Sequence, residues 1–417
     1  MKKIIINAHP LMGKWTGVEV YILALIQALE KHFAHQEVEI MLFAYDKLYS
    51  SLEELLKFRS LSLSLSLSDN SQPLKSHPKT FLQRLKSITP NKIYLYFKTK
   101  SRRFLAHCTT FGLLGDFILF VKYRFLWNRN KTLRSKSFDL CIEAGWPIYY
   151  IHPLNAKKTL VCIHDLPLCD PQSWFLSKDS IALWKHYIYP KMATCTQAIC
   201  FCKCVKFDIL KTFHFSSECV HVIYHGLRTY RVGACESLPS NLGEFILAVG
   251  QAKRKNILRL IEAFKLLPQE LQGRFKIVLT GTHNDLSESE KRYCQQDFII
   301  NLGYVSDSLL QTLYANARLL WWGSLAEGFG LPMLEAMRAS CVILASNVSC
   351  MPEILGDAGI YCNPYNAKDI AKQLEIALTD ESLRQECIQK GLERVKLFDF
   401  NESMQKHLEI IERMLEE

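Results

Sequence analysis

The chain has 417 residues, more than a single hydrophobic core usually holds, and this length fits two domains of ordinary size. Hydrophobic residues make up 49% of the sequence and charged residues 22%, a balance typical of folded proteins and not of disordered ones. The net charge is +10. Because no run of about 18 apolar residues occurs, we expect no membrane-spanning helix. The short apolar run after Lys2 and Lys3 does not match a signal peptide.

The positive charge is concentrated in residues 75–136. This segment contains fifteen lysines and arginines and one acid, Asp116, so it carries +14 and leaves −4 for the rest of the chain. Aromatic and leucine residues are interleaved with the cations, which predicts attachment to an anionic membrane surface. We therefore expect a cytoplasmic protein held peripherally at the inner face of the cell membrane. A solvated insertion is one alternative. Binding to nucleic acid or another anionic polymer is a second, but the segment contains no recognisable nucleic-acid motif, and no nucleic-acid partner is expected.

Fifteen cysteines occur in the chain, and without an export signal we expect them to be reduced thiols. Four of them, at positions 195, 200, 202 and 204, are close in sequence, but their spacing matches no common zinc site. Buried free thiols are predicted there, and no metal is expected.

The first half of the chain opens with a strand, a helix and a strand, the pattern of a parallel sheet. The expected elements are strands over residues 3–8, 38–43, 138–143, 159–164 and 218–223, and a helix from Gly17. Residues 61–68 alternate leucine and serine, and we interpret them as part of a low-complexity insertion without chemistry. Small and polar residues over 228–241 predict a linker.

A second β-α-β series follows the linker. The expected elements are strands over residues 245–249, 275–280, 298–302, 317–322, 342–345 and 359–362, helices over 258–267 and 308–315, and a last helix over about 401–417. Two doubly wound parallel sheets joined by a linker are therefore predicted. Such sheets bind ligands at the carboxyl ends of their strands.

Two carboxylates, Glu327 and Glu335, flank a glycine-containing loop that joins an apolar strand to a helix beginning near Pro332. This arrangement directs backbone N–H groups and the positive end of a helix dipole toward one place, which suits a phosphate. The carboxylates can accept hydrogen bonds from sugar and ribose hydroxyls. The loop therefore predicts a nucleotide-sugar site, with two solvated glutamates as the alternative. The loop residues expected at the donor are Gly328, Phe329, Gly330 and Leu331.

A second loop begins at Gly250, directly after the strand over 245–249, and carries Lys253, Arg254 and Lys255 before a helix. Arginine offers a planar fork to phosphate oxygens and lysine a point charge. Such cations stabilise the negative charge that grows on a departing diphosphate. A solvated helix start is the alternative, but clustered cations oppose the helix dipole there, which favours a ligand.

These motifs resemble the retaining glycosyltransferases of family 4, which have the GT-B fold. The likeness rests on Glu327 to Glu335 as an E-x7-E signature, on residues 345–353 and 356–359, and on Arg254-Lys255-Asn256, which is similar to the family's Arg-Lys-Asn motif. It covers most of the C-terminal half and recurs in parts of the N-terminal half. The resemblance implies an acceptor-side domain over 1–227 with a basic insertion at about 60–136, a nucleotide-sugar-binding domain over 242–400, and a C-terminal helix over 401–417 that crosses back to the first domain.

The resemblance also implies roles for the motif residues. Glu327 would contact the transferred sugar, Glu335 the ribose, and Arg254 and Lys255 the diphosphate, with Lys253 a bystander. Whether Glu327 acts as a nucleophile is left open, because the leaving phosphate can take the acceptor's proton on the same face of the sugar.

Five further positions match the family less specifically. Gly17 would face the donor phosphate from the first domain, with Glu19 on the acceptor side, although a simple turn would look the same. His164 would contact the transferred sugar and Asp165 the acceptor, with a structural histidine as the alternative. Val305 would hold the nucleotide base through backbone groups, although a turn and a helix cap read equally well.

Two segments depart from the family pattern. Ser340-Cys341-Val342 stands where the family has Gly-Thr-Pro, so we expect a differently built helix exit. Residues 201–204 lack the usual Val-Ser pair, which puts an acceptor-side role there in doubt.

The function expected from the resemblance is transfer of a hexose, with mannose from GDP-mannose expected, to a lipid-linked or lipopolysaccharide/O-antigen-type glycan. The nucleoside diphosphate sugar is the substrate, and no metal or other cofactor is expected. A sugar-nucleotide hydrolase or epimerase of the same fold is the alternative enzyme, and an anionic-polymer binder is the alternative of another class.

Overall fold

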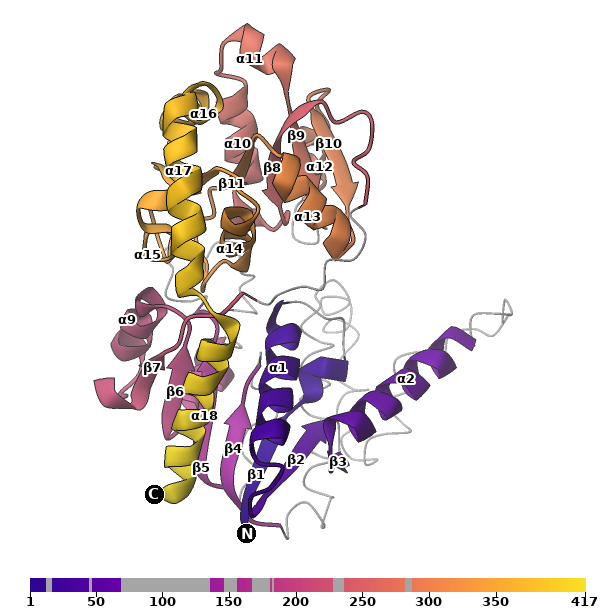
Figure 1. The fold of residues 1–417 in the computed structure, drawn as a ribbon, viewed down its shortest axis with the longest axis vertical. Coiled ribbons are helices and arrows are strands. Elements are labelled where there is room, and N and C mark those ends of the chain that lie inside the picture. The colour runs from indigo at the N-terminus through magenta and orange to yellow at the C-terminus, as the bar shows by residue number, and fades with distance from the viewer. Residues whose placement is uncertain are drawn as a thin grey trace, which may run out of the picture. The chain divides into compact units, whose positions relative to one another are not determined.

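The computed structural model describes residues 1–12, 17–44, 47–68, 136–145, 156–166, 181, 184–227, 236–281 and 287–417. Within these residues the chain forms two sheets, each accompanied by helices (Figure 1). By their contacts the residues fall into two compact units, the first over 1–162, 177–197 and 411–417 and the second over 163–176 and 198–410. None of the described helices is both long and apolar enough to cross a membrane.

The first sheet has the strand order β3-β2-β1-β4-β5-β6-β7. Its strands are β1 (Lys2–Asn7), β2 (Val38–Ala44), β3 (Lys47–Tyr49), β4 (Phe138–Glu143), β5 (Ala156–Ile163), β6 (Gln197–Cys200) and β7 (Val220–Val222). Strand β1 pairs in parallel with β2 and β4, β4 with β5, and β6 with β7, whereas β2 and β3 are antiparallel. The helices of this part are η1 (His9–Met12), α1 (Gly17–His32), α2 (Leu52–Ser68), η4 (Trp184–Ile188), α8 (Tyr189–Met192), α9 (Lys203–Thr212) and η5 (Ser217–Cys219).

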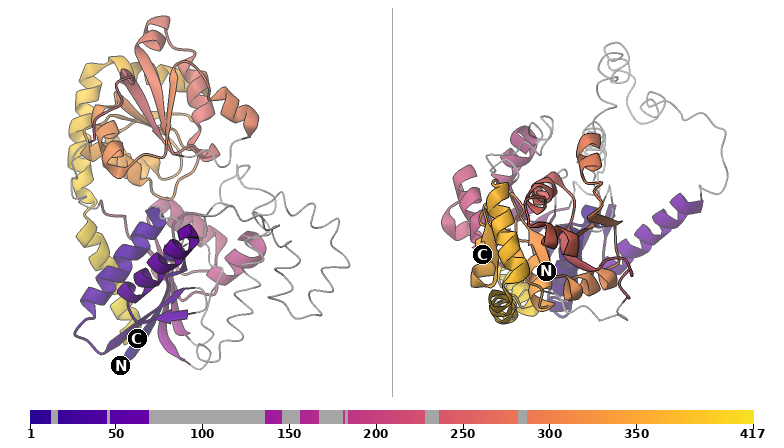
Figure 2. Two further views of the ribbon diagram at one scale, coloured as in Figure 1. Left: turned by 90° about the vertical axis from the view of Figure 1, so that its right-hand side faces the viewer. Right: turned by 90° about the horizontal axis from the view of Figure 1, so that it is seen from above.

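The second sheet has the order β10-β9-β8-β11-β12-β13, and all its neighbouring strands run parallel. Its strands are β8 (Glu244–Val249), β9 (Phe275–Thr280), β10 (Ile299–Gly303), β11 (Leu319–Trp322), β12 (Ile343–Ser346) and β13 (Ile360–Cys362). The helices are η6 (Lys253–Lys255), α10 (Ile257–Phe264), α11 (Gln269–Arg274), α12 (Glu288–Tyr293), α13 (Asp307–Asn316), α14 (Leu331–Arg338), α15 (Met351–Leu355), η7 (Gly356–Ala358), α16 (Ala367–Thr379), α17 (Glu381–Arg394), η8 (Val395–Leu397) and α18 (Phe400–Glu416). Helices flank this sheet on both faces (Figure 2), as a doubly wound fold requires.

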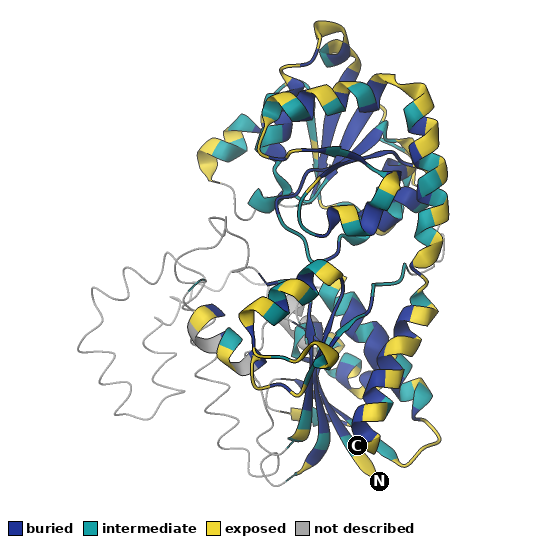
Figure 3. Cartoon of the chain, turned by 90° about the vertical axis from the view of Figure 1, so that its left-hand side faces the viewer, coloured by how far each residue is buried: buried dark blue, intermediate teal, exposed yellow. Residues whose placement is uncertain are grey.

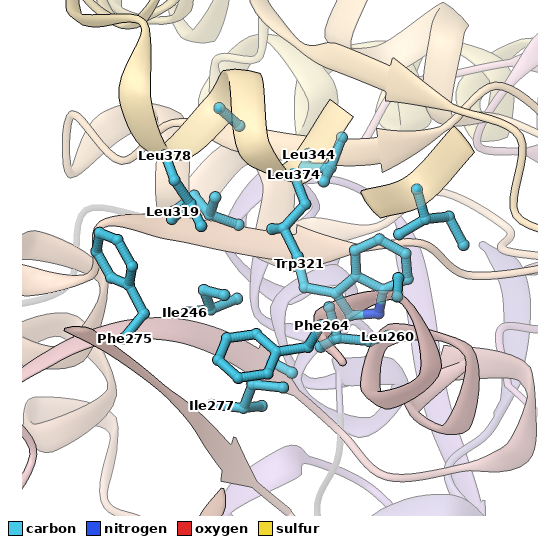
Figure 4. Packing of buried hydrophobic residues seen from close by; sticks show 14 of the residues in the cluster. Ile246, Leu260, Phe264, Phe275, Ile277, Leu319, Trp321, Leu344, Leu374 and Leu378 are labelled. Atoms are coloured by element: carbon cyan, nitrogen blue, oxygen red, sulfur yellow. The ribbon is translucent and has the colours of Figure 1, made fainter. Parts of the chain in front are cut away.

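The core of the second unit packs around the strands. These strands are continuous apolar runs, because both faces of a parallel sheet are covered. Strand residues are buried while the outer faces of the helices are exposed (Figure 3). Trp321 on β11 packs among Ile246, Leu260, Phe264 and Leu374 from the neighbouring strand and helices (Figure 4). This packing holds the carboxyl ends of β8 and β11 in place.

Residues 61–68, the leucine–serine repeat, form the second half of α2, and their interpretation as part of an insertion without chemistry stays a prediction. The basic segment over 75–136 lies outside the described residues except for Lys136. The linker over 228–241 is described only from residue 236.

Residues 411–417, which include the end of α18, belong to the first unit, whereas the rest of this helix belongs to the second. Lys158 donates from Nζ to the carbonyl oxygen of Met414 at 3.0 Å, and His32 Nε2 lies 2.6 Å from Glu412 Oε1. These contacts tie the end of α18 to β5 and α1.

Candidate active site

The loops that follow β8 and β11 meet because the two strands are neighbours. Leu319 lies opposite Ile246 and Trp321 opposite Ala248 in a parallel pair, so both strands end at the same edge of the sheet. Chain order also reverses between them, since β9 and β10 extend the sheet on one side and β12 and β13 on the other. Ligands of parallel sheets bind at such a reversal. Residues far apart in sequence therefore come together there.

Glu327 pairs with both cations predicted beside it. Its Oε2 accepts a hydrogen bond from Arg254 at 2.5 Å, and its Oε1 accepts one from Lys255 at 2.6 Å. The side chain of Glu327 is 7% exposed, that of Lys255 12% and that of Arg254 34%. Lys253 instead lies 3.4 Å from Glu290, which agrees with its expected role as a bystander.

Burial and charge act against each other in this cluster. Burial works to raise the pKa of Glu327, but the positive charges of Arg254 and Lys255 outweigh it and hold the pKa at about 2. Burial lowers the pKa of Lys255 to about 8, although Glu327 acts in the opposite direction. At pH 7 all three side chains are charged, with a net charge of +1. The cluster therefore suits an anionic ligand.

Neighbouring groups fix the two loops. Asn256 has a left-handed backbone with φ 59°, and its side-chain amide donates to the carbonyl oxygens of Gly323 at 3.2 Å and Pro364 at 2.8 Å. The hydroxyl of Ser349 accepts from the backbone N–H of Glu327 at 3.2 Å and donates to its carbonyl oxygen at 3.0 Å. The carboxylate of Glu327 thus extends from a backbone held at both polar groups.

Glycine is required at two positions of the clamp loop, residues 327–330. A Cβ on Gly328 would lie 1.8 Å from the carbonyl oxygen of His164, so no side chain fits there. Gly330 has φ 91° and stands at the N-cap of α14, which begins at Leu331, with Pro332 in its first turn. The predicted strand, glycine loop and helix are therefore present, with the helix starting one residue before the predicted proline.

Glu335 lies on α14, where its Oε2 accepts a hydrogen bond from the hydroxyl of Tyr314 on α13 at 3.0 Å. Val305 lies in the loop between β10 and α13. Ser306 caps α13 by accepting from the backbone N–H of Leu309 at 3.0 Å, which is the helix cap that the sequence left open. The expected roles toward ribose and base stay predictions.

His164 and Asp165 follow β5 and belong to the second unit. The ring of His164 stacks on Phe201 with centroids 4.7 Å apart, and the ring of His225 stacks on Phe201 with centroids 3.8 Å apart. The Oδ1 atom of Asp165 is buried without a hydrogen-bond partner among the described residues. Burial raises the pKa of Asp165 to about 6, while Arg254 opposes this rise and Glu327 adds to it. The pKa of Asp165 therefore depends on the charges of Arg254 and Glu327.

Gly17 and Glu19 begin α1 in the first unit. Residues 13–16, which precede them, lie outside the described part of the chain. The donor role of Gly17 and the acceptor-side role of Glu19 stay predictions.

Sequence reasoning missed several residues that support the site. Nothing in the sequence indicated that Ser349 contacts Glu327, apart from its place in the family-like segment 345–353. Nothing indicated that Tyr314 contacts Glu335, apart from its place in a predicted helix. Glu353 accepts from the first backbone N–H groups of α9, at 2.7 Å from Lys203 and 3.1 Å from Cys204. Such pairings depend on tertiary contacts that no local pattern contains.

The cysteines in the described residues are free thiols, and most of them are buried. Cys202 caps α9, because its sulfur accepts from the backbone N–H of Val205 at 3.3 Å, and its thiol donates to the carbonyl oxygen of Gly328 at 3.1 Å. Within the described residues no group of histidine, cysteine and acidic side chains is arranged to hold a metal ion. The departure at residues 201–204 thus serves packing behind the clamp loop.

Comparisons with known proteins show which families the chain resembles. Residues 237–394 match the family model described as glycosyl transferases group 1. The chain is 26% identical over 302 residues to O-antigen chain mannosyltransferase B of Escherichia coli, covering 68% of this chain and 77% of that protein. It is 36% identical over 187 residues to the serotype-specific mannosyltransferase WbdA of Escherichia coli. That match covers 43% of this chain and only 23% of WbdA, so the chain spans about a quarter of WbdA's length.

Among solved structures, sucrose-phosphate synthase from Thermosynechococcus elongatus matches the chain with a TM-score of 0.63 and 16% identity, covering 99% of each chain. At this identity the likeness shows the fold alone. The family model covers the second sheet and the two loops built on it, and the match to mannosyltransferase B extends into the first half. Residues 237–394 therefore match the group 1 glycosyltransferases, the chain as a whole is similar to mannosyltransferases, and it has the GT-B fold expected from its motifs.

Proposed function

We propose that the protein is a retaining hexosyltransferase that moves mannose from GDP-mannose to a lipid-linked or lipopolysaccharide/O-antigen-type glycan. The relatives described above are mannosyltransferases of O-antigen and serotype-specific glycans, which supports both the sugar and the acceptor class. The observation that carries the proposal is the pairing of Glu327 with Arg254 and Lys255 at the switch point of the second sheet. It joins a carboxylate suited to sugar hydroxyls with cations suited to a diphosphate.

The charges of Glu327, Arg254 and Lys255 support different roles for the carboxylate and the two cations. Both oxygens of Glu327 accept a bond from a cation, which supports hydrogen bonding to the sugar rather than attack on its anomeric carbon. Arg254 and Lys255 would neutralise the diphosphate as the C1–O bond to it breaks. The new bond to the acceptor oxygen would form on the same face, and the acceptor's proton would pass to the leaving phosphate oxygen. Retention of configuration follows without a covalent sugar–enzyme intermediate.

The other site residues complete this assignment. Glu335 would bind the ribose, Val305 the base, and the loop from Gly328 to Leu331 the phosphates. His164 would contact the transferred sugar, and Asp165 would meet the acceptor. No step in this scheme requires a metal ion.

We also propose the domain boundaries 1–227 and 242–400, and attachment of the first domain to the inner face of the cell membrane through residues 75–136. The +14 charge of that segment, interleaved with aromatic residues, supports the attachment.

A thermal-shift screen tests the nucleotide-sugar proposal. GDP and GDP-mannose should raise the unfolding midpoint, because a ligand that binds only the folded state stabilises it by mass action. UDP and ADP should leave the midpoint unchanged. Stabilisation by UDP alone would contradict the guanine donor, and the absence of any shift with all three nucleotides would contradict a nucleotide-sugar site.

A further inference from the structure

Trp322, the last residue of β11, has a buried polar atom that the motifs do not explain. The side chain is 2% exposed, and its indole Nε1 has no hydrogen-bond partner in the part of the chain that the structure describes. Its neighbour Trp321 differs, since the indole N–H of Trp321 donates to the carbonyl oxygen of Lys255 at 3.3 Å. A buried N–H without an acceptor costs folding free energy. A tryptophan at position 322 therefore calls for a reason other than stability.

The ring of Trp322 contacts both loops of the candidate site. Lys255 Nζ lies over the ring at 3.6 Å from its centroid, within the range of a cation–π interaction. A Cβ built on Gly330 would lie 3.2 Å from the indole Nε1. The indole N–H is therefore located beside the N-cap of α14, while the ring face carries the ammonium group of Lys255.

The start of α14 adds a favourable field at the same place. Its N-cap is Gly330, and no side chain caps the helix. Pro332 has no N–H and the N–H of Met333 donates to the carbonyl oxygen of Gly330 at 2.9 Å, so the helix contributes mainly its dipole, which favours a negative charge. The indole N–H, the ammonium group of Lys255 and the helix start together suit the oxygens of a diphosphate.

We propose that Trp322 binds the nucleoside diphosphate of the donor directly. Its indole N–H donates a hydrogen bond to a phosphate oxygen, and its ring holds Lys255 in position for the same diphosphate. Nε1 is buried in this structure, so a phosphate oxygen reaches the N–H when the loop from Gly328 to Gly330 shifts. Two residues without side chains permit such a shift. The inference rests on the proposed nucleotide-sugar function and adds a residue that the family-like motifs do not contain.

Trp322→Phe in the full chain isolates the hydrogen bond, because phenylalanine keeps an aromatic ring beneath Lys255 and removes the N–H. Calorimetric titration should show GDP affinity reduced about tenfold, as expected for a lost hydrogen bond to a charged group. Affinity for guanosine, which has no phosphate, should not change. Trp321→Phe is the matched control, because both variants remove the same atoms from a buried position and should lower the unfolding midpoint without nucleotide. The fall should be smaller for Trp322→Phe, because the N–H that it removes has no partner, whereas the N–H of Trp321 donates to Lys255.

Three outcomes separate the possibilities. Equal GDP affinity for Trp322→Phe and the unsubstituted protein would overturn the role of Trp322 and leave the proposed function standing. Equal losses of GDP and guanosine affinity, together with a fall in the unfolding midpoint as large as that of Trp321→Phe, would assign Trp322 to packing alone and would also overturn it. If the unsubstituted protein bound neither GDP nor UDP, the nucleotide-sugar function would fail first, and the inference with it.

Discussion

Glu327 accepts hydrogen bonds from the two cations that are assigned to the donor diphosphate. In the proposed reaction these cations must turn from the carboxylate to the phosphate oxygens, which leaves the carboxylate for sugar hydroxyls. A buried charge is costly without a partner. The carboxylate therefore keeps the cations placed and charged until the diphosphate takes over its role.

Removing Glu335 and removing Glu327 should have different effects on GDP affinity and on mannose transfer. Glu335→Ala should weaken GDP affinity roughly ten- to hundredfold, because a charged acceptor for the ribose is lost. Glu327→Ala should abolish mannose transfer, because its partner in the reaction is the sugar, and should reduce GDP affinity less than Glu335→Ala does, because the diphosphate itself can hold Arg254 and Lys255. Calorimetric titration with GDP beside a transfer assay measures both. Tyr314→Phe, which removes the hydroxyl that donates to Glu335, is the control and should cause a smaller loss of affinity than Glu335→Ala. Similar losses of GDP affinity for both glutamate variants would refute the assignment.

Lys255 gives the reaction a pH dependence. Its pKa in the folded chain is about 8, below the ordinary value of 10.5, so the free protein loses the ammonium charge as pH rises through about 8. Because the folded state binds this proton less tightly than the unfolded state, folding stability should rise between about pH 8 and 10.5 while kcat/KM falls above pH 8. Lys255→Arg keeps its charge over this range. Its kcat/KM should therefore be lower but flat with pH, and a parallel fall in both proteins would contradict the role of Lys255.

At the scale of residues, the sequence predicted which groups lie at the site but not how they pair. The order of cations, glycines and glutamates identified Arg254, Lys255 and Glu327, because their chemistry and their places after strands are local features. The unpartnered atoms of Asp165 and Trp322 could not be predicted, since burial without a partner depends on surrounding elements.

Among the elements, α9 depends on a carboxylate from a distant part of the second unit. Glu353 accepts from the backbone N–H groups of Lys203 and Cys204 and, at 2.9 Å, from the hydroxyl of Tyr224. Glu353→Ala should reduce the free energy of unfolding by about 1–2 kcal/mol, the usual cost of removing a helix N-cap. Denaturant unfolding measures this change, and hydrogen exchange should quicken at the start of α9. Glu375→Ala, at an exposed position of α16, is the control and should change stability by less than about 0.5 kcal/mol. Equal effects of the two substitutions would contradict the capping role.

The strands were predicted well because buried parallel strands are apolar runs that end at glycine or polar residues. The helical conformation of residues 61–68 was not predicted, because a repeat of leucine and serine has no helical periodicity of its own. Leucine is a strong helix former, and α2 starts at Leu52 with Glu53 and Glu54 in its first turn, where acidic side chains are favourable. A helix that starts well continues through the repeat. Ser340 lies at the exit of α14, where the family pattern has glycine. Its backbone is left-handed, with φ 57°, a conformation that suits glycine better than serine.

For the whole molecule, the charge distribution predicts membrane attachment. The +14 segment should bind vesicles containing anionic lipid, since each cation near such a surface contributes about 1 kcal/mol, and high salt should weaken this binding. Co-sedimentation of the full chain with anionic and with neutral vesicles, each at low and high salt, measures the effect. Equal binding to both kinds of vesicle, or binding to neither, would show that the charges act in solvent alone.

The central claim is that this chain transfers mannose from GDP-mannose to a glycan with retention of configuration. The most direct test incubates the full chain with GDP-mannose, with and without a mannose-terminated lipid-linked oligosaccharide, and follows both GDP release and the glycan product. We expect GDP release that depends on the acceptor, a product with the anomeric configuration of the donor sugar, and loss of transfer in Glu327→Ala. Full GDP release without acceptor, or a product of inverted configuration, would contradict it.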